Sequence, residues 1–414
     1  MINNGISMKK NYFWNTIAMI ISSLSSAMLV YISSFTVSEN EVGYVTFAFS
    51  LSSLLLIVGK FGGRDFQMSS IYERVLNDSG LIIRYLFTFI MFILALVYCY
   101  ATSCIREKFF IILFTLFIYM SESIEDFFWG KYQKKGKIYI GAIMYSIRWI
   151  MVIIVFFCFI TLYEDACIAL GFGAIISWIA LFVSVMVIKE SFVVKIPKAF
   201  LENDAKIIFS ACFPICLSYF CSYYISIVTK IYIDIKMDDV IQAYFGYIFL
   251  FSSCVPVLGT IVFHPQLSVL ANEHNNNIDG FSKKLWKIGL GILGVGFFFS
   301  FVVSIIGIPI LNFLFSCNLS DYKGVLVILL VYGVVLALST FAGSVEVILA
   351  KQKSLLAVNV FGAILISILD FGGFVKGSLL NMTIVLVSVQ IVILLFQVLI
   401  IKRCIYEEKN ENQF

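Results

Sequence analysis

The chain has 414 residues, of which 61% are hydrophobic and only 13% are charged, and its mean hydropathy is +0.99. A soluble domain carries roughly 45–50% apolar and about 25% charged residues, so this composition excludes a water-soluble globular enzyme and fits a surface that faces lipid. The net charge of +4 is too small to indicate an acidic partner, and we expect no nucleic-acid binding.

Apolar runs long enough to cross a bilayer recur along the whole chain. A transmembrane helix needs about 20 mostly apolar residues, and by this rule we place about twelve spans. The predicted fold is therefore an all-α membrane protein. In chain order, the predicted spans are 13–34, 42–61, 81–101, 109–129, 138–161, 166–188, 207–231, 240–264, 285–307, 325–349, 355–373 and 382–401.

The positions of the basic residues orient these spans. When both termini are placed in the cytoplasm, most of the 29 Lys and Arg residues fall in segments on the inner side. Cytoplasmic loops of membrane proteins carry such an excess of basic residues. Arg106 and Lys108, in an outer segment, are the clearest exceptions. We therefore expect cytoplasmic N- and C-termini.

A polar stretch at 189–206 divides the spans into two equal groups. We expect an N-terminal lobe at 1–188, a cytoplasmic linker at 189–206, a C-terminal lobe at 207–401 and a cytoplasmic tail at 402–414. Because each lobe has six spans, the first span of each lobe starts on the cytoplasmic side. A repeat between the lobes would therefore be parallel.

The pattern leaves no room for a separate catalytic domain, because every predicted loop is short. No G-x-x-x-x-G-K-[ST] phosphate loop is present. The cysteines have no zinc-site spacing, and His264 and His274 cannot form a metal site alone. We expect no cofactor and no metal, and chemistry confined to the space within and between helices.

Arg148 is the clearest charge inside a predicted span. A charge near the bilayer centre costs at least about 2.5–3.5 kcal/mol, so it needs a partner or a function. Glu122, Glu125 and Asp126 share one face of the preceding span and are candidate partners. Arg148 either forms an ion pair with them or faces an anionic substrate, and the acids are also candidates for ion coupling.

Other charges stand near the ends of predicted spans. Lys230 lies near the outer end of the seventh span and is a candidate for substrate binding, or it extends to the membrane interface. Glu346 and Asp370 either bind a coupling cation or proton or sit at the interface. Arg64 follows the second span, where it is a substrate-binding candidate or one half of a solvated pair with Asp65.

Short motifs around the second span carry a resemblance to a known family. Glu41-Val42-Gly43-Tyr44 opens this span, and Phe61-Gly62-Gly63-Arg64-Asp65-Phe66-Gln67 follows it. In the second half, Pro214, Lys230 and Ala243-Tyr244 form a related pattern. The sequence resembles the O-antigen (Wzx-type) polysaccharide flippases of the multidrug/oligosaccharidyl-lipid/polysaccharide exporter superfamily.

The resemblance implies a transporter rather than an enzyme, located in the cell inner (cytoplasmic) membrane. Its cargo would be an undecaprenyl-pyrophosphate-linked glycan, an O-antigen or capsule repeat unit of lipopolysaccharide or polysaccharide biosynthesis. Membrane lipid, a coupling H⁺ or Na⁺, and the polymerase and chain-length regulator of the same pathway are the implied partners. Rocking of the two lobes would give alternating access.

Two other functions remain open from the sequence. A drug/cation antiporter of the same superfamily would need acidic residues that face a central cavity. A membrane-embedded glycan polymerase or ligase would need a larger outer loop than any that is predicted here. The short outer loops favour the transporter.

Overall fold

The computed structural model describes residues 2–68, 78–193, 204–263, 266–349, 351–373 and 377–411. These residues form helices and their connections, with no strand among them, so the predicted all-α fold is confirmed. His264 and most of the predicted linker, residues 194–203, lie outside the described residues.

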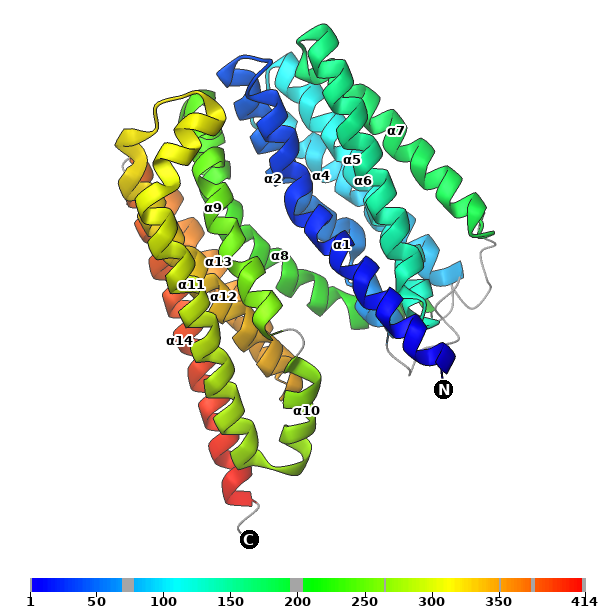
Figure 1. The fold of residues 1–414 in the computed structure, drawn as a ribbon, viewed down its shortest axis with the longest axis vertical. Coiled ribbons are helices and arrows are strands. Elements are labelled where there is room, and N and C mark those ends of the chain that lie inside the picture. The colour runs from blue at the N-terminus through cyan, green and yellow to red at the C-terminus, as the bar shows by residue number, and fades with distance from the viewer. Residues whose placement is uncertain are drawn as a thin grey trace. The chain divides into compact units, whose positions relative to one another are not determined.

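Each predicted span coincides with a long helix, and short helices are added between some of them (Figure 1). In chain order the helices are α1 (Ile2–Ser33), α2 (Glu39–Lys60), α3 (Gly63–Met68), α4 (Asp78–Ala101), α5 (Arg106–Lys134), α6 (Ile138–Tyr163), α7 (Ala166–Val187), α8 (Ala205–Lys236), α9 (Asp239–Phe263), α10 (Leu267–Asn276), α11 (Ile278–Phe315), η4 (Ser320–Tyr322), α12 (Lys323–Ile348), α13 (Gln352–Phe371) and α14 (Leu379–Glu411).

Within the described residues, 11 helices are long and apolar enough to cross a membrane. They match the predicted spans except the fourth, which is α5. That helix is long enough, but it carries charged residues in its first turn and three acids, Glu122, Glu125 and Asp126, in its second half. The expected multi-pass membrane protein is thus present, while the cytoplasmic placement of the termini stays a prediction.

The end of α2 turns the chain sharply into α3. Phe61 caps α2 in the left-handed region at φ 46°, and Gly62 follows at φ 62°. Glycine adopts this region without the steric cost that other residues bear, which explains Gly62 in the turn. The turn places Arg64, in the first turn of α3, next to the last turn of α2 that carries Lys60.

The chain divides into two compact units, Met1–Phe220 and Cys221–Phe414, and the division falls inside α8. We call these unit 1 and unit 2 and describe each by itself. These units do not have the same boundaries as the two six-helix lobes and the linker expected from the sequence, and those lobes stay a prediction.

In unit 1, α5 is the central helix and packs against α2, α4, α6 and α7. Every residue from Ser121 to Gly130 is buried. A helix buried all round lies in the interior of a large bundle. It packs tightly against α6, where a Cβ on Gly141 would overlap the indole of Trp129. The acids of α5 therefore stand in the centre of unit 1.

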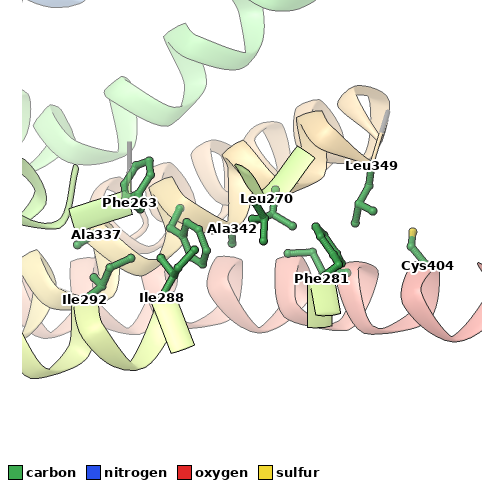
Figure 2. Close-up of a cluster of buried hydrophobic side chains, with 12 residues drawn as sticks. Phe263, Leu270, Phe281, Ile288, Ile292, Ala337, Ala342, Leu349 and Cys404 are labelled. Atoms are coloured by element: carbon green, nitrogen blue, oxygen red, sulfur yellow. The ribbon is translucent and has the colours of Figure 1, made fainter. Parts of the chain in front are cut away.

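Unit 2 contains an apolar cluster to which α9, α10, α11, α12 and α14 contribute (Figure 2). Leu270 of α10 and Phe281 of α11 are fully buried and point into it, and Cys404 of α14 closes its far end. Burying such side chains gains about 1.5–3 kcal/mol each, so this cluster fixes the short helix α10 against its longer neighbours.

Candidate functional site

The candidate site of unit 1 is a network of ion pairs around α5. Glu122, Glu125 and Asp126 are spaced at three and four residues, which places their side chains on one face of the helix. Basic side chains from α2, α3, α4 and α6 meet that face. The structure thus brings together five of the predicted site residues, which are Arg64, Glu122, Glu125, Asp126 and Arg148.

Glu122 accepts from three groups at once. The Nζ of Lys60 lies 3.0 Å from its Oε1, while Nη2 of Arg148 lies 3.2 Å from its Oε2. The indole Nε1 of Trp149 donates to the same Oε2 at 3.0 Å. Hydrogen bonds to the charged form stabilise a buried carboxylate. Glu122 is therefore held as an anion between one cation of α2 and one of α6.

Arg148 forms ion pairs with two acids of α5 in the interior of unit 1. Its Nε donates to Oε2 of Glu125 at 2.7 Å, and its Nη1 donates to Oγ of Ser177 at 3.1 Å. The side chain is 0% exposed. Ser177 in turn lies 2.6 Å from Oγ of Ser121. Arg148 is thus tied to α5 and α7 and has no exposed surface with which to contact a ligand.

Asp126 repeats the arrangement of Glu122 one turn further along α5. The Nη2 of Arg84 lies 3.2 Å from its Oδ2, and Nη1 of Arg64 lies 3.6 Å from its Oδ1. Arg64 also donates from Nε to Oε1 of Gln133 at 2.7 Å. Its guanidinium stacks 4.2 Å from the ring centroid of Trp129, which fixes its direction.

Exposure separates the four cations into two kinds. The side chains of Lys60 and Arg64 are 32% and 27% exposed, whereas those of Arg84 and Arg148 are 2% and 0% exposed. Removing one partner of a buried pair costs about 3–5 kcal/mol, because a charge is left without compensation. Only Lys60 and Arg64 have surface that a ligand can reach.

A small cavity adjoins the network beside Lys60 and Arg84. It has a volume of about 20 Å³ and is also lined by Gly63 and Gln67. A Cβ on Gly63 would lie 2.9 Å from Nη2 of Arg84, so only glycine leaves this approach open. Within the described part of the chain, Nη1 and Nη2 of Arg84 and Oε1 of Gln67 are buried and have no hydrogen-bond partner, so the contact between Arg84 and Asp126 is an ion pair only. The cavity fits one water-sized polar group.

The remaining predicted site residues lie in unit 2 and do not join this network. Lys230 of α8 places its Nζ 4.7 Å from the ring centroid of Phe249 on α9. Glu346 of α12 is 0% exposed and Asp370 of α13 is 1% exposed. Among the described residues, none of their four carboxyl oxygens has a hydrogen-bond partner. A buried carboxyl group without a hydrogen-bond partner is costly, so each of the two groups is a candidate ion site.

Sequence reasoning missed two members of the network, Lys60 and Arg84. Arg84 lies inside the predicted span 81–101, so the rule that singled out Arg148 as a charge within a span applies to it equally. Lys60 stands at the end of a span and gives no such indication. In the described residues, no group of three or more His, Cys, Asp or Glu side chains is arranged to hold a metal ion.

Solved structures of transporters share this fold. The lipid II flippase MurJ, in an inward closed conformation, aligns with a TM-score of 0.68 at 15% identity, over 97% of this chain and 88% of its own. An inward-facing multidrug resistance MATE family transporter of the MOP superfamily aligns with a TM-score of 0.65 at 12% identity, over 94% and 98%. A eukaryotic MATE transporter aligns with a TM-score of 0.63 at 15% identity, over 99% of each chain.

At these identities the likeness establishes the fold. No protein-family model matches the chain, and no curated protein matches it significantly.

Proposed function

We propose that this protein is a flippase that carries an undecaprenyl-pyrophosphate-linked oligosaccharide across the cytoplasmic membrane of a bacterium. The cargo joins an apolar tail to an anionic diphosphate and a polar glycan, neither of which crosses hydrocarbon unaided. The fold is shared with a flippase for a lipid-linked substrate, lipid II. The proposal extends this kind of cargo to an O-antigen or capsule repeat unit, as the motif resemblance implies.

The observation that carries the proposal is the pair of exposed cations in unit 1. Lys60 and Arg64 lie at the end of α2 and the start of α3, where the predicted topology places the cytoplasmic face. Arg and Lys side chains bind phosphate oxygens through charge-assisted hydrogen bonds. A diphosphate that arrives from the cytoplasm would meet these two cations first. Arg148, which is buried and paired, supports this site without touching the cargo, and Lys230 remains a second candidate contact.

An ion gradient would supply the energy for transport. One charge moved through 100 mV gives about 2.3 kcal/mol. Glu346 and Asp370 are the candidate sites for the coupling H⁺ or Na⁺, because both are buried and their oxygens have no partner within the described residues. Glu122, Glu125 and Asp126 are weaker candidates, since their charges are already compensated by arginine and lysine.

The experiment is a test of surface glycan in a strain that lacks the gene and carries plasmid-encoded variants. We expect Lys60→Ala and Arg64→Ala together to abolish surface glycan while the protein still inserts and folds. Lipid-linked glycan would accumulate on the cytoplasmic side. Normal surface glycan in the deletion strain itself would refute the proposed cargo.

A drug/cation antiporter is the second candidate function. Two observations favour it: the fold is shared with multidrug transporters, and unit 2 holds two buried acids whose oxygens have no hydrogen-bond partner within the described residues. Drug susceptibility of the deletion strain separates the two functions. Increased susceptibility together with unchanged surface glycan would favour the antiporter.

A further inference from the structure

The two ion-pair groups of unit 1 are built on one plan. In each, a carboxylate of α5 bridges a partly exposed cation and a buried arginine. Glu122 joins Lys60 to Arg148, with distances of 3.0 and 3.2 Å. Asp126 joins Arg64 to Arg84, with distances of 3.6 and 3.2 Å. The exposed and buried cations therefore stand on opposite sides of each carboxylate.

Each carboxylate keeps a buried arginine when its exposed cation leaves, although Glu122 shares Arg148 with Glu125. If Lys60 turns to another anion, Glu122 keeps Arg148 and the indole of Trp149. If Arg64 turns away, Asp126 keeps Arg84. In each of these pairs the cation is partly exposed, so solvent screens the pair more than it screens a fully buried one, and an anionic phosphate group can compete for the cation. The fully buried pairs are much harder to break.

The geometry points to an exchange of partners, a step that rests on the flippase function proposed above. We propose that Glu122 and Asp126 hold Lys60 and Arg64 ready in the absence of cargo and release both to a diphosphate group when it arrives. Arg84 and Arg148 are positioning residues: each keeps a cation beside one of the two carboxylates during this exchange and does not contact the ligand.

The spacing of the two carboxylates suits a ligand with two anionic groups. Residues four apart on a helix have Cβ atoms about 5–6 Å apart, so Glu122 and Asp126 present their exposed cations roughly one helical turn apart. A diphosphate carries charge on two linked phosphoryl groups and can take both cations together.

The first test measures the affinity of the purified full-length protein for inorganic pyrophosphate by calorimetry in detergent. Glu122→Gln removes the carboxylate that competes for Lys60, and we expect an affinity increase of about two- to fivefold. Arg148 keeps Glu125 and Ser177 in this variant, so it should remain folded. Adding Lys60→Ala to Glu122→Gln should abolish the increase.

The chain offers a matched control in Glu190, which pairs with Lys131 at 2.5 Å and with Lys135 at 3.9 Å. Glu190→Gln changes the net charge of unit 1 by the same amount without touching Lys60 or Arg64. It should leave pyrophosphate affinity unchanged. An equal increase of pyrophosphate affinity in Glu190→Gln would show that net charge alone causes the effect, and it would overturn the exchange. Unchanged or absent pyrophosphate binding in folded Glu122→Gln would overturn it as well.

A second measurement needs no substitution and so does not depend on how a variant folds. Lys60 and Lys131 are 32% and 28% exposed, and each pairs with a glutamate. Inorganic pyrophosphate should slow the modification of Lys60 by an amine-reactive reagent and leave that of Lys131 unchanged. Equal rates for Lys60 with and without pyrophosphate would overturn the proposal. Transport is judged separately from surface glycan, so failure of the cargo assignment and failure of the exchange give different results.

Discussion

Arg148 on α6 and Glu122 on α5 form an ion pair of 3.2 Å in the interior of unit 1, and the arginine side chain has no exposed surface. The pair links two helices that are joined by a short turn, and Glu125 and Ser177 complete the coordination of the guanidinium. Because burial of these charges is costly unless every partner is present, the pair acts as a structural joint between α5, α6 and α7. Substitution of Arg148 should therefore lower the stability of the protein, and any effect on transport should follow from that loss.

Arg148→Ala should lower the free energy of unfolding by about 3–5 kcal/mol, because Glu125 is left buried without a cation. Arg148→Lys should cost less, since it keeps the charge, but a single ammonium cannot donate to Glu122, Glu125 and Ser177 in the same fixed geometry. Thermal unfolding in detergent measures both. Loss of surface glycan in Arg148→Ala with unchanged stability would assign the residue to substrate contact instead.

Glu346→Gln and Asp370→Asn should each stop transport if an ion binds at these carboxyl groups. The amide keeps the size of the side chain but cannot exchange a proton or neutralise a cation. Surface glycan in cells and cargo-dependent H⁺ or Na⁺ flux in proteoliposomes measure the effect. Glu407→Gln is the control, because Glu407 is exposed and pairs with Arg403. Full transport in both test variants would show that neither Glu346 nor Asp370 is the coupling site.

The same two carboxyl groups give an opposite prediction for stability. Glu346→Met replaces a buried polar group without a described partner by an apolar side chain of similar length. We expect the free energy of unfolding to rise by about 1–3 kcal/mol, the usual penalty of a buried unsatisfied group. Guanidinium or thermal unfolding of the purified protein measures this change. A clear loss of stability would show that Glu346 has a partner that stabilises the fold.

Gly141→Ala tests the close contact between α5 and α6. The added Cβ would overlap the indole of Trp129 and lie 2.7 Å from its Cα, so the two helices must separate. Overpacking of this kind costs about 1–3 kcal/mol. Gly289→Ala is the matched control on α11, where no atom lies within 4 Å of the new Cβ. Equal thermal stability in the two variants would contradict the packing described for unit 1.

Reporter fusions test the topology, which rests on basic residues alone. A green fluorescent protein placed after the last residue should fluoresce, and alkaline phosphatase at the same position should be inactive. A phosphatase inserted in the predicted outer loop between the ninth and tenth spans should be active. Activity at the C-terminus would place the tail on the outer side of the membrane and contradict the predicted topology.

Much of the fold was predictable because a bilayer imposes a simple rule on sequence. Each predicted span lies within one long helix or overlaps most of it, although α1, α11 and α14 extend well beyond the predicted limits, since an apolar run of sufficient length satisfies its backbone groups only as a helix. The helices α3 and α10 were not predicted. Both are short, and α10 is held by burial of Leu270 against residues that are distant in sequence. Local pattern does not encode such contacts.

The sequence by itself determined the class of the protein and the number of long helices. It predicted the side of the membrane on which each loop lies and the charged residues within the spans. Only the tertiary structure decided which charges meet. It placed Lys60 and Arg84 beside the acids of α5, buried Arg148 completely, and left Glu346 and Asp370 without a partner among the described residues. The reason is physical: the cost of a buried charge follows from its own position, whereas its compensation depends on which helix packs beside it.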